Sequence, residues 1–76
     1  MPKWKPCKRR VFIKKLKRIG FAVPEPGGNH FYMRYGTYTF TVPNNQEYSV
    51  PQVKTLVKEI EQGIRRKITL DEWDSL

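Results

Sequence analysis

Hydrophobic residues recur at helical spacing in the first part of the chain, within "CKRRVFIKKLKRIGF" at positions 7–21. Their spacing places them on one side of a helix. They are Phe12, Leu16 and Ile19, with Ile13 at the edge of the stripe. Gly20 stands where a helix C-cap is expected. The pattern predicts an amphipathic first helix whose apolar side faces a core.

The clearest alternating pattern is "HFYMRYGTYTFTV" at positions 30–42, which predicts two antiparallel strands. Gly36 and Thr37 suit a two-residue type II′ turn between them. The turn sets three cross-strand pairs whose apolar side chains share one face and should form core. These pairs are Tyr35 with Tyr38, Met33 with Phe40, and Phe31 with Val42. The other face should be polar, and it carries His30, Tyr32, Arg34, Thr39 and Thr41.

Prolines and glycines interrupt the pattern between the helix and these strands. Phe21 and Val23 predict a short strand, which the prolines on either side of Glu25 restrict to a sheet edge. Gly27 and Gly28 are expected to form a loop whose backbone can approach a ligand closely.

The second half of the chain predicts a loop and then a helix from about Val50 to Gln62. Ser49 and Gln52 have the spacing of a capping box, and Gly63 is expected to end the helix. The apolar stripe of this helix is Val53, Leu56, Val57 and Ile60. The same capping-box spacing in "TLDE", at positions 69–72, predicts a short final turn that Trp73 can pin to the core.

The order of elements is therefore helix, two or three antiparallel strands, and helix. Seventy-six residues make one small domain, so positions 1–76 are interpreted as a single unit. Two amphipathic helices on one face of a small sheet predict an α+β two-layer sandwich. The opposite face of the sheet should be partly open to solvent.

Charge is distributed unevenly along the chain. Fifteen Lys and Arg residues stand against seven Asp and Glu, a formal net charge of +8. Nine of the basic residues, and none of the acidic ones, lie in the first twenty positions. Concentrated positive charge is typical of proteins that bind nucleic acid, although it can also be a solvated helix face. The expected phosphate contacts on the first helix are Arg10, Lys14, Lys17 and Arg18, with Lys3 and Lys5 nearby.

The cysteine content, the hydropathy and the absence of known motifs limit the compartment, the membrane contacts and the cofactors that we expect. Cys7 is the only cysteine, so no disulfide can form within these residues, and a reducing compartment such as the cytoplasm is expected. No apolar stretch approaches the ~18 residues of a membrane span, so no membrane partner is expected. The chain has no CxxC pair, His/Cys cluster or glycine-rich nucleotide motif, so neither a metal nor a cofactor is expected.

His30 is the only histidine, the residue type best suited to proton transfer near neutral pH. RNA supplies its own nucleophile, the 2′-hydroxyl, so its cleavage needs a proton carrier and groups that stabilise charge on phosphorus. His30 and the basic residues could supply both, although a lone histidine at a strand start is more often structural. On the same strand face, Arg34 is a candidate for charge stabilisation and Tyr32 for stacking on an unpaired base.

Several short segments together resemble the HicA (YcfA-like) family of toxin–antitoxin mRNA interferases. They include "IKKLKRIGF", "GGNHFYMRY", "YTFTVPNN", "SVPQVKTLVKEIEQ" and "ITLDEW", and the match extends from about Lys5 to Trp73. The resemblance implies an α-β-β-β-α fold similar to a double-stranded RNA-binding domain. It also implies a cognate antitoxin protein of the HicB type as partner. The catalytic histidine of the family, in its GSH or GGxH motif, falls on His30.

The chain departs from the family pattern at two places. Asn29 stands where a serine or lysine often precedes the histidine. Gln46 stands where related sequences often carry a second histidine, in "PNPH".

Three hypotheses follow from these patterns. The leading one is a metal-independent mRNA endoribonuclease that acts through His30, with Gly27, Gly28 and Asn29 beside it in contact with RNA. The second is a non-catalytic RNA-binding module of the same fold. The third is an adaptor whose basic face meets an acidic protein.

Overall fold

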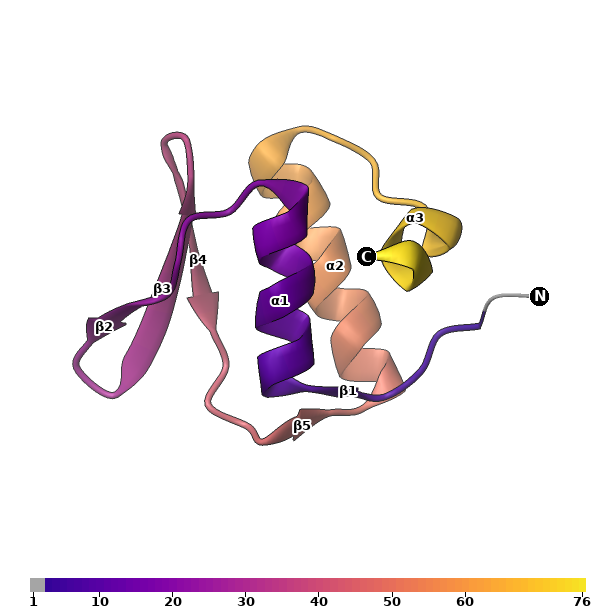
Figure 1. Cartoon of the computed structure of the whole chain (residues 1–76), viewed down its shortest axis with the longest axis horizontal. Helices are drawn as coiled ribbons and strands as arrows, with labels where there is room; N and C mark the ends of the chain where they lie inside the picture. The colour runs from indigo at the N-terminus through magenta and orange to yellow at the C-terminus, as the bar shows by residue number, and fades with distance from the viewer. Residues whose placement is uncertain (1–2) are drawn as a thin grey trace.

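Two amphipathic helices cover one face of a three-stranded antiparallel sheet in the computed structural model, which describes residues 3–76 (Figure 1). The expected α+β two-layer arrangement is confirmed. The elements are β1 (Cys7–Lys8), α1 (Arg9–Ile19), β2 (Glu25–Gly27), β3 (His30–Tyr35), β4 (Tyr38–Val42), β5 (Glu47–Tyr48), α2 (Val50–Ile64) and α3 (Leu70–Ser75). Within this series, α1-β2-β3-β4-α2 follows the α-β-β-β-α order expected from the sequence.

The β3–β4 hairpin has the register expected from the sequence. Tyr35 lies opposite Tyr38, Met33 opposite Phe40, and Phe31 opposite Val42. Gly36 in the turn takes a φ of 59°, as the first central position of a type II′ turn requires, and this conformation favours glycine. One face of the hairpin therefore points toward the helices and the other points outward.

The strand before this hairpin lies further along the chain than expected. β2 is Glu25–Gly27 and pairs with β3 at the edge of the sheet, so the prediction of a strand at Phe21 and Val23 is wrong. Phe21 is instead buried against the sheet, with its ring centroid 5.3 Å from that of Tyr35. The expected two-glycine loop is shifted by one residue, because Gly27 ends β2 and Gly28–Asn29 form the turn.

The core lies between the inner face of the sheet and the helices. It combines the apolar stripes of α1 and α2 with the inner residues of the hairpin. The largest fully buried side chains are Tyr48, Phe12, Phe40, Leu16, Met33, Ile60, Val42 and Val53. Phe31 is an exception to the predicted core, because 41% of its surface is exposed. It lies next to the β2–β3 turn, which projects past α1 and α2 at the lower left of Figure 1, so neither of these helices covers it there.

A two-stranded ladder of β1 and β5 passes beneath the start of α1 (Figure 1) and places Cys7 opposite Tyr48. Tyr48 is fully buried, and its hydroxyl donates to the carbonyl oxygen of Pro43 at 2.6 Å. The two strands lie in segments predicted as a helix start and a loop. The first helix therefore begins at Arg9, two residues later than predicted, and the predicted loop contains a core residue.

The second helix begins where predicted and ends later. Ser49 is its N-cap, and its hydroxyl accepts a hydrogen bond from the N–H of Gln52 at 3.4 Å. The helix continues through Gly63, and the lack of a side chain at this position leaves room for the ring of Tyr38. The chain instead leaves the helix at Arg65, which takes a left-handed φ of 55°.

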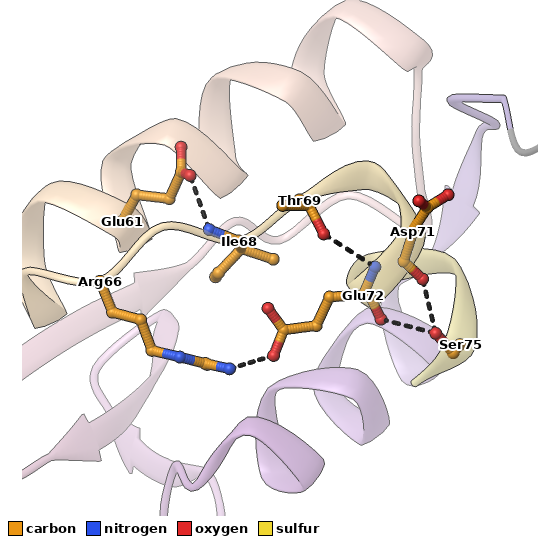
Figure 2. Close-up of polar contacts among 7 residues, drawn as sticks. All are labelled: Glu61, Arg66, Ile68, Thr69, Asp71, Glu72 and Ser75. Atoms are coloured by element: carbon orange, nitrogen blue, oxygen red, sulfur yellow. Dashed lines mark hydrogen bonds and ion pairs between the residues drawn. The ribbon is translucent and has the colours of Figure 1, made fainter.

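The C-terminal segment is tied to α2 by a polar contact (Figure 2) and to the core by Trp73. Glu61 Oε2 accepts a hydrogen bond from the N–H of Ile68 at 2.7 Å. Thr69 caps α3 by accepting from the N–H of Glu72 at 3.1 Å, as the capping-box spacing predicts. Trp73 is only 5% exposed, so the final helix is pinned to the core as expected.

Candidate functional site

His30 is the first residue of β3, and its side chain is exposed to solvent. It lies opposite Gly27 of β2 and directly follows the Gly28–Asn29 turn. Within residues 3–76, no hydrogen bond or ion pair involves the imidazole. Both ring nitrogens are therefore open to a ligand.

The outward face of the sheet brings three of the predicted residues together. Side chains alternate along a strand, so His30, Tyr32 and Arg34 rise on the same side at steps of roughly 7 Å. Thr41 lies opposite Tyr32, and Thr39 lies opposite Arg34. The predicted polar face is thus present, with His30 at the end nearest the β2–β3 turn.

Glu25 also lies on this face and is absent from the residues predicted for the site. It is opposite Tyr32 in the β2–β3 ladder, and its Oε2 lies 2.8 Å from Nε of Arg34. Both side chains remain more than half exposed. The sequence signal for Glu25 would have been a strand placed at 25–27, which pairs it across from the polar positions of β3.

Gly27 and Gly28 differ in the space around them. A side chain at position 27 would overlap the ring of Tyr32, so this ring covers the backbone of Gly27. Gly28 has a φ of 69°, and no atom of the described residues outside its chain neighbours lies within 4 Å of the position of a β-carbon. The expected close approach of a ligand to a glycine backbone is therefore available at the Gly28–Asn29 turn, beside His30.

A shallow depression lies beside Tyr32 on the outward face. Its volume is about 390 Å³, and it is lined by Glu25, Pro26, Gly27, Tyr32, Arg34 and Thr39. An aromatic ring and an exposed ion pair thus border one open space that is large enough to admit a nucleobase. His30 does not line this depression, but its side chain lies on the same face.

The predicted basic stripe on α1 is exposed along its length. It consists of Arg10, Lys14, Lys17 and Arg18. Within the described part of the chain, none of the four side chains makes a hydrogen bond or an ion pair. The stripe therefore keeps its positive charges available to a polyanion.

Other basic residues near the N-terminus have structural contacts. Lys5 lies 3.9 Å from Asp74, and Arg9 donates to the Asn44 side-chain oxygen at 2.8 Å. Lys15 donates to the carbonyl oxygen of Trp73 at 2.7 Å and sits over the indole ring. The nine basic residues of this region are thus divided between surface charge and contacts within the fold.

The basic stripe and His30 lie on different layers of the domain. Phe12 and Leu16 turn the apolar side of α1 toward the core, so the stripe faces solvent on the helical layer. His30 lies on the sheet face that points away from the helices. An RNA strand that contacts both must therefore pass around an edge of the sheet.

The lone cysteine does not join the site. Cys7 is buried, and burial raises the pKa of its thiol, so the reactive thiolate is disfavoured.

Within residues 3–76, no three His, Cys, Asp or Glu side chains gather as metal ligands. No helix in the same range is long and apolar enough to cross a membrane.

Comparisons with family models, with curated proteins and with solved structures find no match to this chain. The residues and their arrangement are therefore the basis for a functional assignment.

Proposed function

We propose that this protein is a metal-independent mRNA endoribonuclease that acts through His30, as its resemblance to HicA-type toxins implies. The observation that carries the proposal is the position of His30. Its imidazole is exposed and has no partner among residues 3–76, and it lies at the end of an outward sheet face that also holds Tyr32 and Arg34. A histidine in this position can meet an RNA strand laid along the sheet.

The proposed reaction uses the nucleophile that RNA already carries. His30 accepts the proton of a 2′-hydroxyl, and the 2′-oxygen attacks the adjacent phosphorus. The bond from phosphorus to the 5′-oxygen breaks, and the leaving oxygen takes a proton from the imidazolium or from water. The products are a 2′,3′-cyclic phosphate and a 5′-hydroxyl, so no metal-bound water is needed.

Charge on the phosphate is proposed to be stabilised next to His30. Arg34 is separated from His30 by Tyr32, and Glu25 offsets its charge, so it is less suited to this role than expected from the sequence. The Gly28–Asn29 turn directly precedes His30, and its backbone N–H groups have no backbone partner within residues 3–76. Backbone N–H groups in such a turn can donate to a phosphate oxygen. The α1 stripe would hold phosphates further along the strand.

The proposed function also implies a protein partner and a cellular location. A toxin of this type would be held inactive by a HicB-like antitoxin, and covering the outward sheet face would block His30. Because the substrate is mRNA, the proposed location is the cytoplasm. Bound antitoxin should protect His30 from diethyl pyrocarbonate, whereas equal reactivity in the complex and the isolated protein would contradict direct occlusion.

The absence of an orienting partner for His30 favours a second candidate, an RNA-binding module without catalysis. General bases are commonly held by a hydrogen bond to a third group, and His30 has none within residues 3–76. One assay separates the two functions: the purified protein is incubated with mRNA in EDTA, and RNA ends are mapped. New 2′,3′-cyclic phosphate and 5′-hydroxyl ends support the endoribonuclease, and intact RNA that is nevertheless bound supports the module.

A further inference from the structure

The Glu25–Arg34 pair has hydrogen-bonding capacity that the fold does not use. The two groups meet through Glu25 Oε2 and Arg34 Nε, which leaves Oε1 of the carboxylate and both Nη atoms of the guanidinium. No hydrogen bond within residues 3–76 involves either side chain. An exposed ion pair of this kind contributes little to stability. The carboxylate and the guanidinium can therefore form hydrogen bonds with a ligand at a small cost in folding free energy.

The pair presents hydrogen-bond donors beside hydrogen-bond acceptors. A guanidinium offers only N–H donors, and an ionised carboxylate offers only acceptors. Among the described residues, Arg34 has its two Nη donors free beside the carboxylate of Glu25, which can accept at Oε1 and at the second lone pair of Oε2. The matching ligand edge is an acceptor followed by two donors.

Among the RNA bases, guanine has this edge. Its Watson–Crick side carries the O6 acceptor, then the N1–H donor, then the N2 amino donor. Adenine and cytosine place a ring-nitrogen acceptor beside their amino group, and uracil has one N–H between two carbonyl oxygens. Each of these three bases would set an acceptor against the carboxylate, which is unfavourable.

Tyr32 supplies a stacking surface at the same place. Its ring rests on the Gly27 backbone and borders the depression of about 390 Å³ that Glu25 and Arg34 also line. An unpaired base that enters this depression can stack on the phenol ring while its edge meets the ion pair. A base paired in a duplex has its Watson–Crick edge occupied and cannot do so.

We infer that Glu25, Arg34 and Tyr32 form a binding site for an unpaired guanine of the RNA, with Glu25 as the residue that selects the base. This inference rests on the proposed RNA substrate and adds its base preference. Because Tyr32 and His30 are two residues apart on β3, the selected guanine lies within a nucleotide or two of the cleaved bond.

The test measures binding without cleavage. Fluorescein-labelled 2′-O-methyl pentanucleotides UUXUU, where X is G, A, C or U, lack the nucleophile and can be titrated with the native protein. We expect the G oligonucleotide to bind at least about tenfold more tightly than the other three. Replacing G by inosine, which lacks the N2 amino group, should give an intermediate affinity.

A matched pair of variants isolates Glu25. Glu25→Gln and Glu47→Gln each remove one exposed negative charge, but Glu47 lies in β5. We expect Glu25→Gln to reduce the ratio of G to A affinity to about one, and Glu47→Gln to leave this ratio unchanged. Equal affinity for all four oligonucleotides, no measurable binding, or a G preference that survives in Glu25→Gln would each overturn the inference.

Unmodified oligonucleotides separate this inference from the proposed function. Cleavage of all four sequences at equal rates would overturn the guanine site and leave the endoribonuclease proposal standing. Selective binding of G without cleavage of any sequence would contradict the endoribonuclease and support the guanine site.

Discussion

The ring of Tyr32 lies on the backbone of Gly27 in the neighbouring strand, in the space that a side chain at position 27 would occupy. This contact fixes the ring at the border of the depression that Glu25 and Arg34 also line. Tyr32 is therefore held in place for a base by packing rather than by a hydrogen bond.

Gly27→Ala should disturb this arrangement. The added methyl group must displace the Tyr32 ring, so we expect the free energy of unfolding to fall by about 1–3 kcal/mol. RNA affinity should fall as well, because the stacking surface moves. Urea unfolding followed by circular dichroism, together with RNA titration, measures both effects.

Gly28→Asn provides the matched control for this change. The β-carbon at position 28 meets open space, and asparagine tolerates the left-handed φ of 69°. We expect a loss of stability below about 1 kcal/mol. Similar losses for the two variants would show that Tyr32 does not depend on Gly27.

The exposed stripe of α1 should act through charge alone. We expect Arg10→Gln combined with Lys14→Gln to weaken binding to all RNA sequences by the same factor. The slope of log affinity against log salt should decrease by about 0.7 for each lost contact with single-stranded RNA. Lys54→Gln combined with Lys58→Gln, which changes two exposed lysines of α2, should leave the slope unaltered. An unchanged slope in the α1 variant would mean that the stripe is only solvated.

Adjacent lysines on α1 should have different effects on stability. Lys15 donates to the carbonyl oxygen of Trp73 in α3 and to that of Leu76, the residue after this helix, whereas Lys14 is exposed to solvent. Removing a charged hydrogen bond at a helix end costs stability, so we expect Lys15→Met to lower the free energy of unfolding by about 1–2 kcal/mol. Lys14→Met should change it by less than about 0.5 kcal/mol. Equal unfolding midpoints in urea would contradict this assignment.

Alkaline pH should destabilise the fold through Tyr48. Burial raises the pKa of its hydroxyl to about 12, above the ordinary value near 10. Below pH 10 the hydroxyl is neutral in both states, so the stabilisation is fully present. As pH rises from 10 to 12, the unfolded chain ionises first, and we expect a loss of up to roughly 2–3 kcal/mol.

Tyr48→Phe isolates this contribution. The variant loses the hydrogen bond to Pro43 at neutral pH, and its stability should then fall less steeply than that of the wild type above pH 10. Urea midpoints measured from pH 8 to 12 give both curves. Parallel curves would assign the alkaline loss to other groups.

The hairpin register and both helix stripes could be predicted because each follows from a local pattern. Gly36 fixed the turn, and the alternation around it placed every pair of β3 and β4. The end of the second helix depends on tertiary packing, and its prediction from the local sequence is wrong. Gly63 resembles a helix stop, but it lies within α2, where its lack of a side chain makes room for the ring of Tyr38. Arg65 takes the left-handed position instead.

The residues of the candidate site that lie on a single strand, β3, could be predicted from the sequence. His30, Tyr32 and Arg34 follow from alternation along β3. Glu25 could not be placed, because its position on this face depends on the β2–β3 pairing, which Phe21 and Val23 obscured with a stronger local strand signal. The separation of the α1 stripe from His30 depends on the side of the sheet that the helices cover.

The most direct test of the central claim compares His30→Ala with the wild type in RNA cleavage, with RNA affinity measured alongside. Thr37→Ala, at the far turn of the β3–β4 hairpin, serves as the control and should cleave like the wild type. We expect His30→Ala to lose at least about 10²-fold in cleavage rate at saturating RNA while binding it with nearly unchanged affinity. A His30→Ala protein that cleaves as fast as the wild type would contradict the claim that this histidine carries the reaction.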